Sequence, residues 1–154
     1  MSTAVATNAR WFIQNLAIVH VRGEQTGESW SLVELSGAQG DMPPLHVHRD
    51  EDEAFYVLDG ELTLFVGDQE IRLTAGECAV APRGIAHVYR VDSETARWLG
   101  LASPTFERFV TAASTPAEAL TLPPGPPAKS PEELGALAGE HGIEILGPPG
   151  ALPS

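Results

Sequence analysis

The chain has 154 residues, 43% of them hydrophobic, and its 9 basic and 21 acidic residues give a formal net charge of −12. This length suits one domain with a substantial core, whereas the charge repels a nucleic-acid backbone or an anionic membrane surface. Because it has one cysteine, no signal-peptide pattern and no apolar run near the roughly 20 residues of a spanning helix, we expect a cytoplasmic protein without nucleic-acid or membrane partners.

The first predicted strands lie in WFIQNLAIVHVR, from residue 11, and in SWSLVELSG, from residue 29. Both are rich in the aromatic and aliphatic residues that strands favour. The first is long and apolar enough that, as an exposed sheet edge, it would invite pairing with another chain. We therefore predict a homodimer. His20, in the first strand, is interpreted as a surface or hydrogen-bonded structural residue.

The segment HVHRDEDE combines two histidines with four carboxylates. His46 and His48 are two positions apart, so on a strand both side chains point to one face. On an unbroken strand Glu53 would point to the opposite face, so a turn must intervene over residues 49–52 if Glu53 joins the histidines. The other carboxylates, Asp50, Glu51 and Asp52, are interpreted as solvated turn residues.

Residues 55–73, FYVLDGELTLFVGDQEIRL, carry two turn signatures in succession. Asp59-Gly60 is typical of a type I′ hairpin turn, and Gly67-Asp68 places the glycine first, as a type II′ turn requires. Between them Leu62, Leu64 and Val66 alternate with Thr63 and Phe65, which is the period of a strand with two different faces. We expect a meander here. Many short strands joined in this way favour a barrel or a double-sheet jelly roll.

A third histidine, His87, follows the turn Pro82-Arg83-Gly84 at the head of the predicted strand HVYRV. Three imidazoles and one carboxylate from separate strands would suit a divalent first-row transition metal, such as Fe, Ni, Mn, Co or Zn, and would leave coordination positions open for substrate or water. Cys78 lies on a neighbouring strand without a flanking basic group, and we interpret it as a small buried apolar residue.

After about residue 104 the pattern changes to helices. FERFVTAAS and TPAEAL resemble short helices, and residues 115–118 and 130–133 each fit a capping box with proline at the first helical position. The last helix should end near His141, which suits the helix dipole, and Gly142 can adopt the left-handed cap.

The predicted organisation has three parts. Residues 1–10 form a flexible N-terminus, residues 11–103 form the barrel, and residues 104–154 form a helical C-terminal extension that contains a stiff Pro-rich connector, LPPGPPAK.

The chain resembles the cupins in two motifs. GDMPPLHVHRDEDEAFYVLDG, from Gly40 to Gly60, is similar to the first cupin motif, G-x5-H-x-H-x4-E-x6-G, at every fixed position. GECAVAPRGIAHVYRV, from Gly76, is similar to the second motif, G-x5-P-x-G-x2-H-x3-N, up to His87, but Val91 replaces the asparagine. The resemblance implies an all-β, double-stranded β-helix (jelly-roll) barrel whose mouth holds one metal ion bound by His46, His48, Glu53 and His87.

More narrowly, a lone cupin domain with a helical C-terminal extension looks like the small bacterial quercetinase-like cupins. That likeness implies a metal-dependent dioxygenase that uses O2 on a small aromatic or enolic, flavonol-like substrate, with Glu53 as the catalytic base for the hydroxyl proton. Two alternatives stay open. One is a non-redox isomerase, lyase or polyketide cyclase, whose turnover persists without oxygen. The other is a small-molecule binding or sensing domain, which a ligand would stabilise without forming product.

Several aromatic and branched residues are candidates for lining the substrate pocket. Phe55, Tyr89 and Val91 share face parity with the proposed ligands, although such side chains also simply fill a barrel. Phe106 and Phe109, in the first C-terminal helix, are expected to pack on the outside of the barrel, and a lid over its mouth is the alternative.

Overall fold

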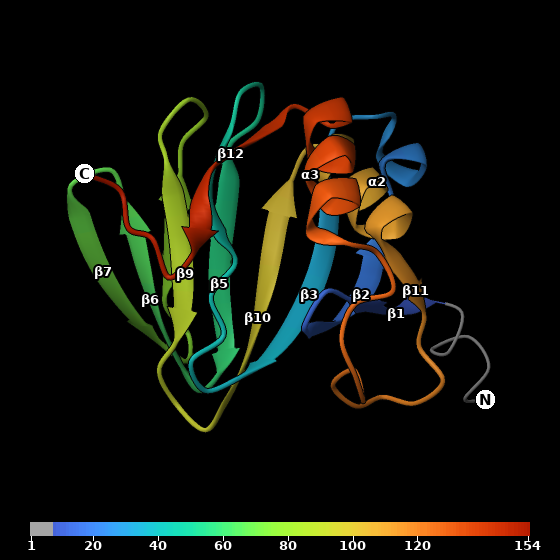
Figure 1. The fold of residues 1–154 in the computed structure, drawn as a ribbon, viewed down its shortest axis with the longest axis horizontal. Coiled ribbons are helices and arrows are strands. Elements are labelled where there is room, and N and C mark those ends of the chain that lie inside the picture. Colours follow the sequence, from blue (N-terminus) through green and yellow to red (C-terminus); the bar gives the residue numbers. More distant parts are fainter. Residues whose placement is uncertain (1–7) are drawn as a thin grey trace.

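The computed structural model describes residues 8–154 and shows two antiparallel sheets that face each other (Figure 1). The seven-stranded sheet has the order β11-β1-β2-β3-β10-β5-β8, and the five-stranded sheet has the order β12-β4-β9-β6-β7. The strands of the first sheet are β1 (Ala9–Phe12), β2 (Asn15–Val21), β3 (Ser31–Ala38), β5 (Glu53–Asp59), β8 (Cys78–Ala81), β10 (Thr95–Ala102) and β11 (Ser114–Pro116). Those of the second are β4 (Pro44–His48), β6 (Glu61–Val66), β7 (Gln69–Thr74), β9 (His87–Val91) and β12 (Ile143–Pro149).

Two α-helices and a short 3-10 helix accompany the sheets: η1 (Gly23–Thr26), α2 (Pro104–Ala113) and α3 (Pro131–Glu140). In Figure 1, α2 and α3 lie together beside the first strands of the larger sheet. The predicted all-β jelly roll with a short helical extension is thereby confirmed. Within the described residues, no helix has both the length and the apolar character needed to cross a membrane.

The helix ends follow the predicted capping chemistry in α3. Ser130 and Glu133 form the expected capping box, and α3 ends at His141, whose Nδ1 lies 2.7 Å from the Leu137 carbonyl oxygen. Gly142 then takes a positive φ of 72°, so this prediction is confirmed.

The predicted helix over TPAEAL is wrong, because Ser114–Pro116 form β11 and pair with β1. Hydrogen bonds from Arg10 on β1 hold this segment as a strand. Its guanidinium donates hydrogen bonds to the Ser114 hydroxyl at 2.8 Å and to the carbonyl oxygens of Thr111 and Ser114 at 3.1 Å. Tertiary pairing with an open strand edge therefore outweighs a local helix signal.

The same pairing removes the exposed edge expected at the N-terminal strand. β1 lies between β11 and β2, and β2 lies between β1 and β3. Neither strand is therefore an edge of the sheet, whereas the homodimer prediction assumed an exposed edge there. The predicted flexible N-terminus covers residues 1–10. Residues 1–7 lie outside the described part of the chain, and β1 already begins at Ala9.

The predicted meander is only half right. Gly67-Asp68 does join a hairpin, with Val66 paired to Gln69 across β6 and β7. Asp59-Gly60 does not, because β5 and β6 belong to different sheets. Gly60, with φ of 80°, instead turns the chain from one sheet to the other.

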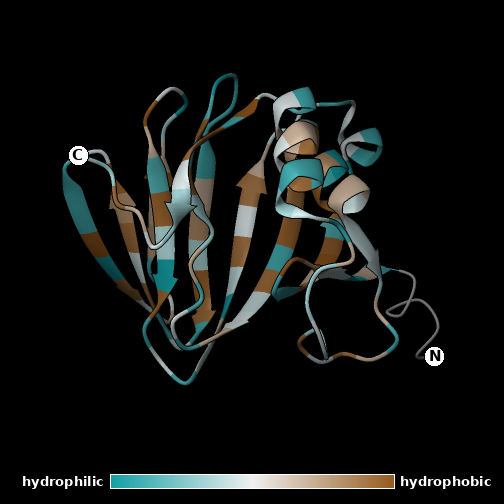
Figure 2. Ribbon diagram, in the orientation of Figure 1, coloured by the Kyte–Doolittle hydropathy of each residue, from teal (hydrophilic) through white to brown (hydrophobic). Residues whose placement is uncertain are grey.

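The core lies between the two sheets, and Figure 2 shows hydrophobic bands alternating with hydrophilic ones along the strands. Leu62, Leu64 and Val66 of β6 belong to this core, together with the fully buried Trp98 of β10. Phe65, on the other face of β6, packs in a second cluster with Leu45, Val88 and Ala151.

Cys78 and His20 lie on the surface. Cys78 was predicted to be buried, but it is exposed, because β8 is the last strand of its sheet and Cys78 pairs with Tyr56 on the outward face. His20 is exposed as predicted, with its Nε2 2.9 Å from Glu34 Oε1.

We predict that Gly60→Ala destabilises the fold more than Gly76→Ala. Both glycines have positive φ, which costs an alanine about 1–2 kcal/mol. A Cβ at Gly60 would also overlap the Thr95 carbonyl oxygen, whereas one at Gly76 would meet nothing within 4 Å, so Gly60→Ala should lose a further 1–3 kcal/mol or so. Urea denaturation of both variants measures the difference, and equal losses would contradict the role of the sheet-to-sheet turn.

Candidate metal centre

The four predicted ligands come together between the two sheets. His46 and His48 lie on β4, and His87 begins β9, its neighbour in the five-stranded sheet, where His46 and His87 are register partners. Glu53 is the first residue of β5 in the opposite sheet. One ligand atom from each residue lies within 4.8 Å of all the others.

The turn that parity required is present between β4 and β5. The Arg49 amide donates to the Gly142 carbonyl oxygen at 3.0 Å, and the Arg83 amide donates to Asp52 Oδ1 at 2.9 Å. These bonds tie the loop to the start of β12 and to the turn before His87. Asp50 and Asp52 are exposed, as predicted.

Backbone carbonyls orient two of the imidazoles. His46 Nδ1 lies 2.8 Å from the Pro44 carbonyl oxygen, and His87 Nδ1 lies 3.3 Å from that of Ile85. A carbonyl only accepts hydrogen bonds, so each Nδ1 carries the proton and each Nε2 keeps a free lone pair. This is how proteins prepare a histidine to bind a metal through Nε2.

The free nitrogens converge on Glu53. The Nε2 atoms of His48 and His87 each lie 3.4 Å from Glu53 Oε2, and all three side chains are buried. His87 Nε2 is a buried polar atom with no hydrogen-bond partner. An unpartnered buried group costs about 1–3 kcal/mol, and a metal ion would supply the missing partner. Three nitrogen donors and one carboxylate also match the preferences of first-row transition metals, so the residues fit such an ion.

For His46 and Glu53 the electrostatics favour the protonation states that metal binding needs. Burial, reinforced by His87 and His48, lowers the pKa of His46 to about 3, so this imidazole is neutral at pH 7. Burial alone would raise the pKa of Glu53, but the adjacent histidines outweigh it and the pKa falls below its usual value. A neutral imidazole and an ionised carboxylate are the ligand forms of these side chains.

Glu51 corrects the prediction of a solvated turn residue. It is only 5% exposed, and its Oε2 accepts a hydrogen bond from His48 Nδ1 at 3.0 Å. Its Oε1 accepts from the Ser103 amide at 3.1 Å and from the Ser103 hydroxyl at 2.6 Å. Burial opposes protonation of His48, yet the hydrogen bond to Glu51 and the charges of Glu53 and Glu51 outweigh it and raise the His48 pKa. A buried imidazole N–H and a helix N-terminus both need an acceptor, and one carboxylate serves both.

Phe106 also departs from its prediction. It was expected on the outside of the barrel, but it is buried in the main core, with its ring centroid 5.9 Å from that of His48. Phe109, one turn later in α2, packs edge-on against Phe12 of β1, with centroids 5.6 Å apart. The start of α2 therefore forms one wall of the candidate site.

The three predicted pocket residues all face the barrel interior. The Phe55 ring centroid lies 6.2 Å from that of His87, and Val91 is fully buried in the core. The Tyr89 hydroxyl donates to Asp41 Oδ2 at 3.2 Å, and burial raises the Tyr89 pKa well above its usual value. These side chains fill the barrel beneath the ligands, and contact with a substrate stays a prediction.

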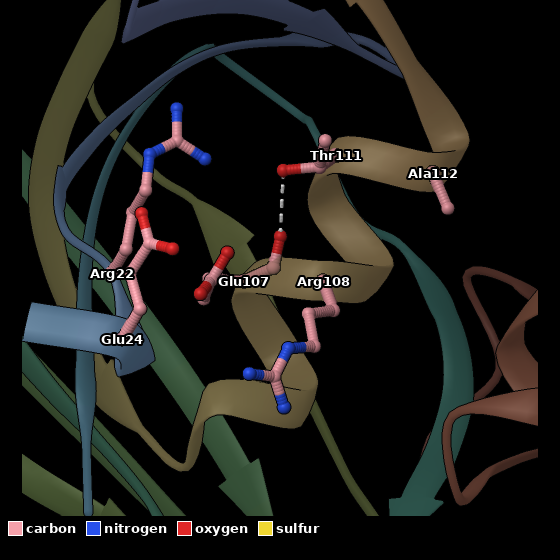
Figure 3. A pocket seen from close by; sticks show the side chains of 6 residues that line it. All are labelled: Arg22, Glu24, Glu107, Arg108, Thr111 and Ala112. Atoms are coloured by element: carbon pink, nitrogen blue, oxygen red, sulfur yellow. Dashed lines mark hydrogen bonds between the residues drawn. The ribbon is translucent and has the colours of Figure 1, made fainter. Parts of the chain in front are cut away.

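A separate hollow of about 340 Å³ lies between η1 and α2 (Figure 3). Its lining mixes both charges and includes none of the four ligand residues: Arg22, Glu24, Glu107, Arg108, Thr111 and Ala112. Glu107 is buried there and accepts a hydrogen bond from the Gly23 amide at 3.0 Å, which gives it a structural role.

Comparisons with known proteins agree with this geometry. Residues 34–101, which contain all four ligand residues, match the family described as Cupin domain. Over 86 residues the chain is 41% identical to quercetin 2,3-dioxygenase from Bacillus subtilis (strain 168), a match that covers 56% of this chain and 26% of that protein. The matched segment thus spans about a quarter of the relative's length.

Solved structures add support for the fold alone. KdgF from Halomonas sp. matches with a TM-score of 0.54 and 20% identity, over 59% of this chain and 79% of that chain. A predicted oxalate decarboxylase from Thermotoga maritima matches with a TM-score of 0.54 and 18% identity, over 58% and 79% of the two chains.

We predict that Co²⁺ or Ni²⁺ raises the melting temperature of the wild-type protein but not that of His87→Ala. A metal at 100 times its dissociation constant adds about 2.7 kcal/mol to the free energy of unfolding, or roughly 5–10 °C for a domain of this size. His20→Ala, which removes an exposed histidine, is the matched control and should respond like wild type. Differential scanning calorimetry with and without metal provides the measurement. Equal stabilisation of His87→Ala would rule out this ligand set.

Proposed function

We propose that the chain, whose residues 34–101 match the Cupin domain family, is a metal-dependent dioxygenase that acts on a small aromatic or enolic substrate of the flavonol type. The observation that carries the proposal is the convergence of His46, His48, Glu53 and His87 inside the cupin segment. The identity with a quercetin 2,3-dioxygenase supports this choice of reaction and substrate class.

The protein's part in the reaction begins with holding the site. When bound, a redox-active first-row metal supplies an open position for O2 or for a deprotonated substrate hydroxyl. The three imidazoles would hold the metal through Nε2, and the carbonyl oxygens of Pro44 and Ile85 keep two of the rings from rotating. A site held this way needs little rearrangement on binding.

Glu53 is the proposed base. Its lowered pKa keeps the carboxylate ionised at neutral pH, so it can take the proton of an incoming hydroxyl. General-base catalysis of this kind contributes about 10²–10⁴-fold to a rate. Because three imidazoles would still hold the metal, a change that keeps the shape of Glu53 but removes its charge should lower turnover more than metal content.

Aromatic side chains give the site a low-polarity wall. Phe106 lies beside His48 and Phe55 beside His87, with centroid distances of 5.9 and 6.2 Å. Flat apolar surfaces suit a planar aromatic substrate, because rings pack favourably against rings in offset or edge-on arrangements.

We predict that the protein loaded with Fe²⁺, Mn²⁺, Co²⁺ or Ni²⁺ consumes O2 in the presence of quercetin, and that Glu53→Gln lowers the rate by about 100-fold or more. An oxygen electrode and the loss of flavonol absorbance measure the rate, and elemental analysis measures the bound metal. The control is Asp52→Asn, which changes an adjacent but exposed carboxylate that pairs with Arg83.

The outcome separates the competing functions. Turnover that persists without oxygen would favour a non-redox isomerase or lyase, and thermal stabilisation by quercetin without product would favour a binding domain. An absence of O2 uptake across flavonols and related enols, with metal bound, would overturn the dioxygenase proposal.

A further inference from the structure

The Glu51 carboxylate joins two parts of the molecule that are far apart in sequence. One oxygen accepts a hydrogen bond from His48 Nδ1, and the other accepts two from Ser103, the N-cap residue of α2. The Ser103 hydroxyl in turn accepts from the Thr105 amide at 3.2 Å. An unbroken chain of hydrogen bonds therefore runs from the first turn of α2 to a proposed metal ligand.

Helix α3 has a complete capping box at its N-terminus, whereas in α2 Glu51 takes the place of the capping carboxylate. In α3 the N-cap Ser130 accepts from the Glu133 amide at 3.1 Å, and Glu133 Oε1 accepts from the Ser130 amide at 3.3 Å. In α2 the equivalent third helical position is Phe106, which has no acceptor. Glu51, 52 residues away from Ser103, supplies the missing carboxylate and keeps one oxygen for His48.

We propose that Glu51 is a positioning residue that fixes the orientation of His48 for metal binding and couples it to helix α2. The proposal rests on the metal site of the proposed function. A carboxylate on Nδ1 holds the tautomer that leaves Nε2 free and makes the imidazole a stronger donor. Because the same carboxylate is anchored by Ser103, the position of α2 determines how firmly it holds the ring.

Phe106 supplies a second contact between the same helix and the same histidine. Its ring packs against His48, while Glu51 accepts the hydrogen bond from His48 Nδ1. The Pro104 ring fits closely over Gly23, where a Cβ would overlap it, so the start of α2 is also held from η1. His48, a proposed metal ligand on the barrel, is thus also in contact with the C-terminal extension.

The test measures Co²⁺ binding to the full chain by chelator competition and by the visible absorption bands of bound Co²⁺. Glu51→Gln should weaken Co²⁺ binding by about 10–100-fold and change the bands, since outer-shell carboxylates typically have effects of this size. Glu133→Gln is the matched control, because it removes the corresponding carboxylate from the cap of α3 without touching a histidine. Its melting temperature should fall while its Co²⁺ affinity and bands stay as in wild type.

Ser103→Ala keeps the His48 contact but removes the shorter of the two hydrogen bonds that anchor Glu51, the 2.6 Å bond from the hydroxyl, and it should cause a smaller loss of affinity than Glu51→Gln. This variant decides the matter if Glu51→Gln does not fold. The proposal would be overturned if Glu51→Gln bound Co²⁺ with an affinity within about twofold of wild type and with unchanged absorption bands. If Glu51→Gln does not fold, the same result for Ser103→Ala would overturn it. Co²⁺ binding needs neither O2 nor flavonol, so a protein without dioxygenase activity still tests Glu51. A wild-type protein that binds no Co²⁺ would overturn the metal site and this proposal together.

Discussion

The structure depends on placing three imidazoles and a carboxylate together between its two sheets. Such a cluster is stable only if each buried ring N–H that faces the protein has an acceptor. The Pro44 and Ile85 carbonyl oxygens and the Glu51 carboxylate are those acceptors. Glu53 lies on one sheet and the three histidines on the other, so the site forms only when the two sheets of the jelly roll face each other.

The barrel supplies the ligands, and the C-terminal extension completes their surroundings. Ser103, the N-cap of α2, anchors Glu51, the hydrogen-bond partner of His48, and Phe106 packs against His48. The Gly142 carbonyl oxygen anchors the loop between His48 and Glu53. The family match ends at residue 101, just before these contacts begin. Residues beyond the matched segment therefore form part of the surroundings of His48 as well as part of the main core.

The sequence predicted that His46 and His48 share a face, because side-chain alternation is a local property of strands. The resemblance to the two cupin motifs implied that Glu53 and His87 join them, and the structure brings the four residues together. Sequence-based prediction failed where partners are distant. Glu51 looked like one more carboxylate in an acidic run, since its second partner lies 52 residues away. Asp59-Gly60 has the composition of a hairpin turn, but local composition does not say which sheet the next strand joins. The pairing of β11 with β1 likewise has no local signal.

Strand β12 has a further consequence for the histidines. Strand β4 meets β9 at the single pair of His46 and His87, whereas β12 pairs along it from Pro44 to His48. Side chains alternate along a strand, so sliding β4 by one residue would turn both of its imidazoles to the opposite face. The ladder with β12 prevents that slip, and a segment that binds no metal thus keeps two of the four ligands in register.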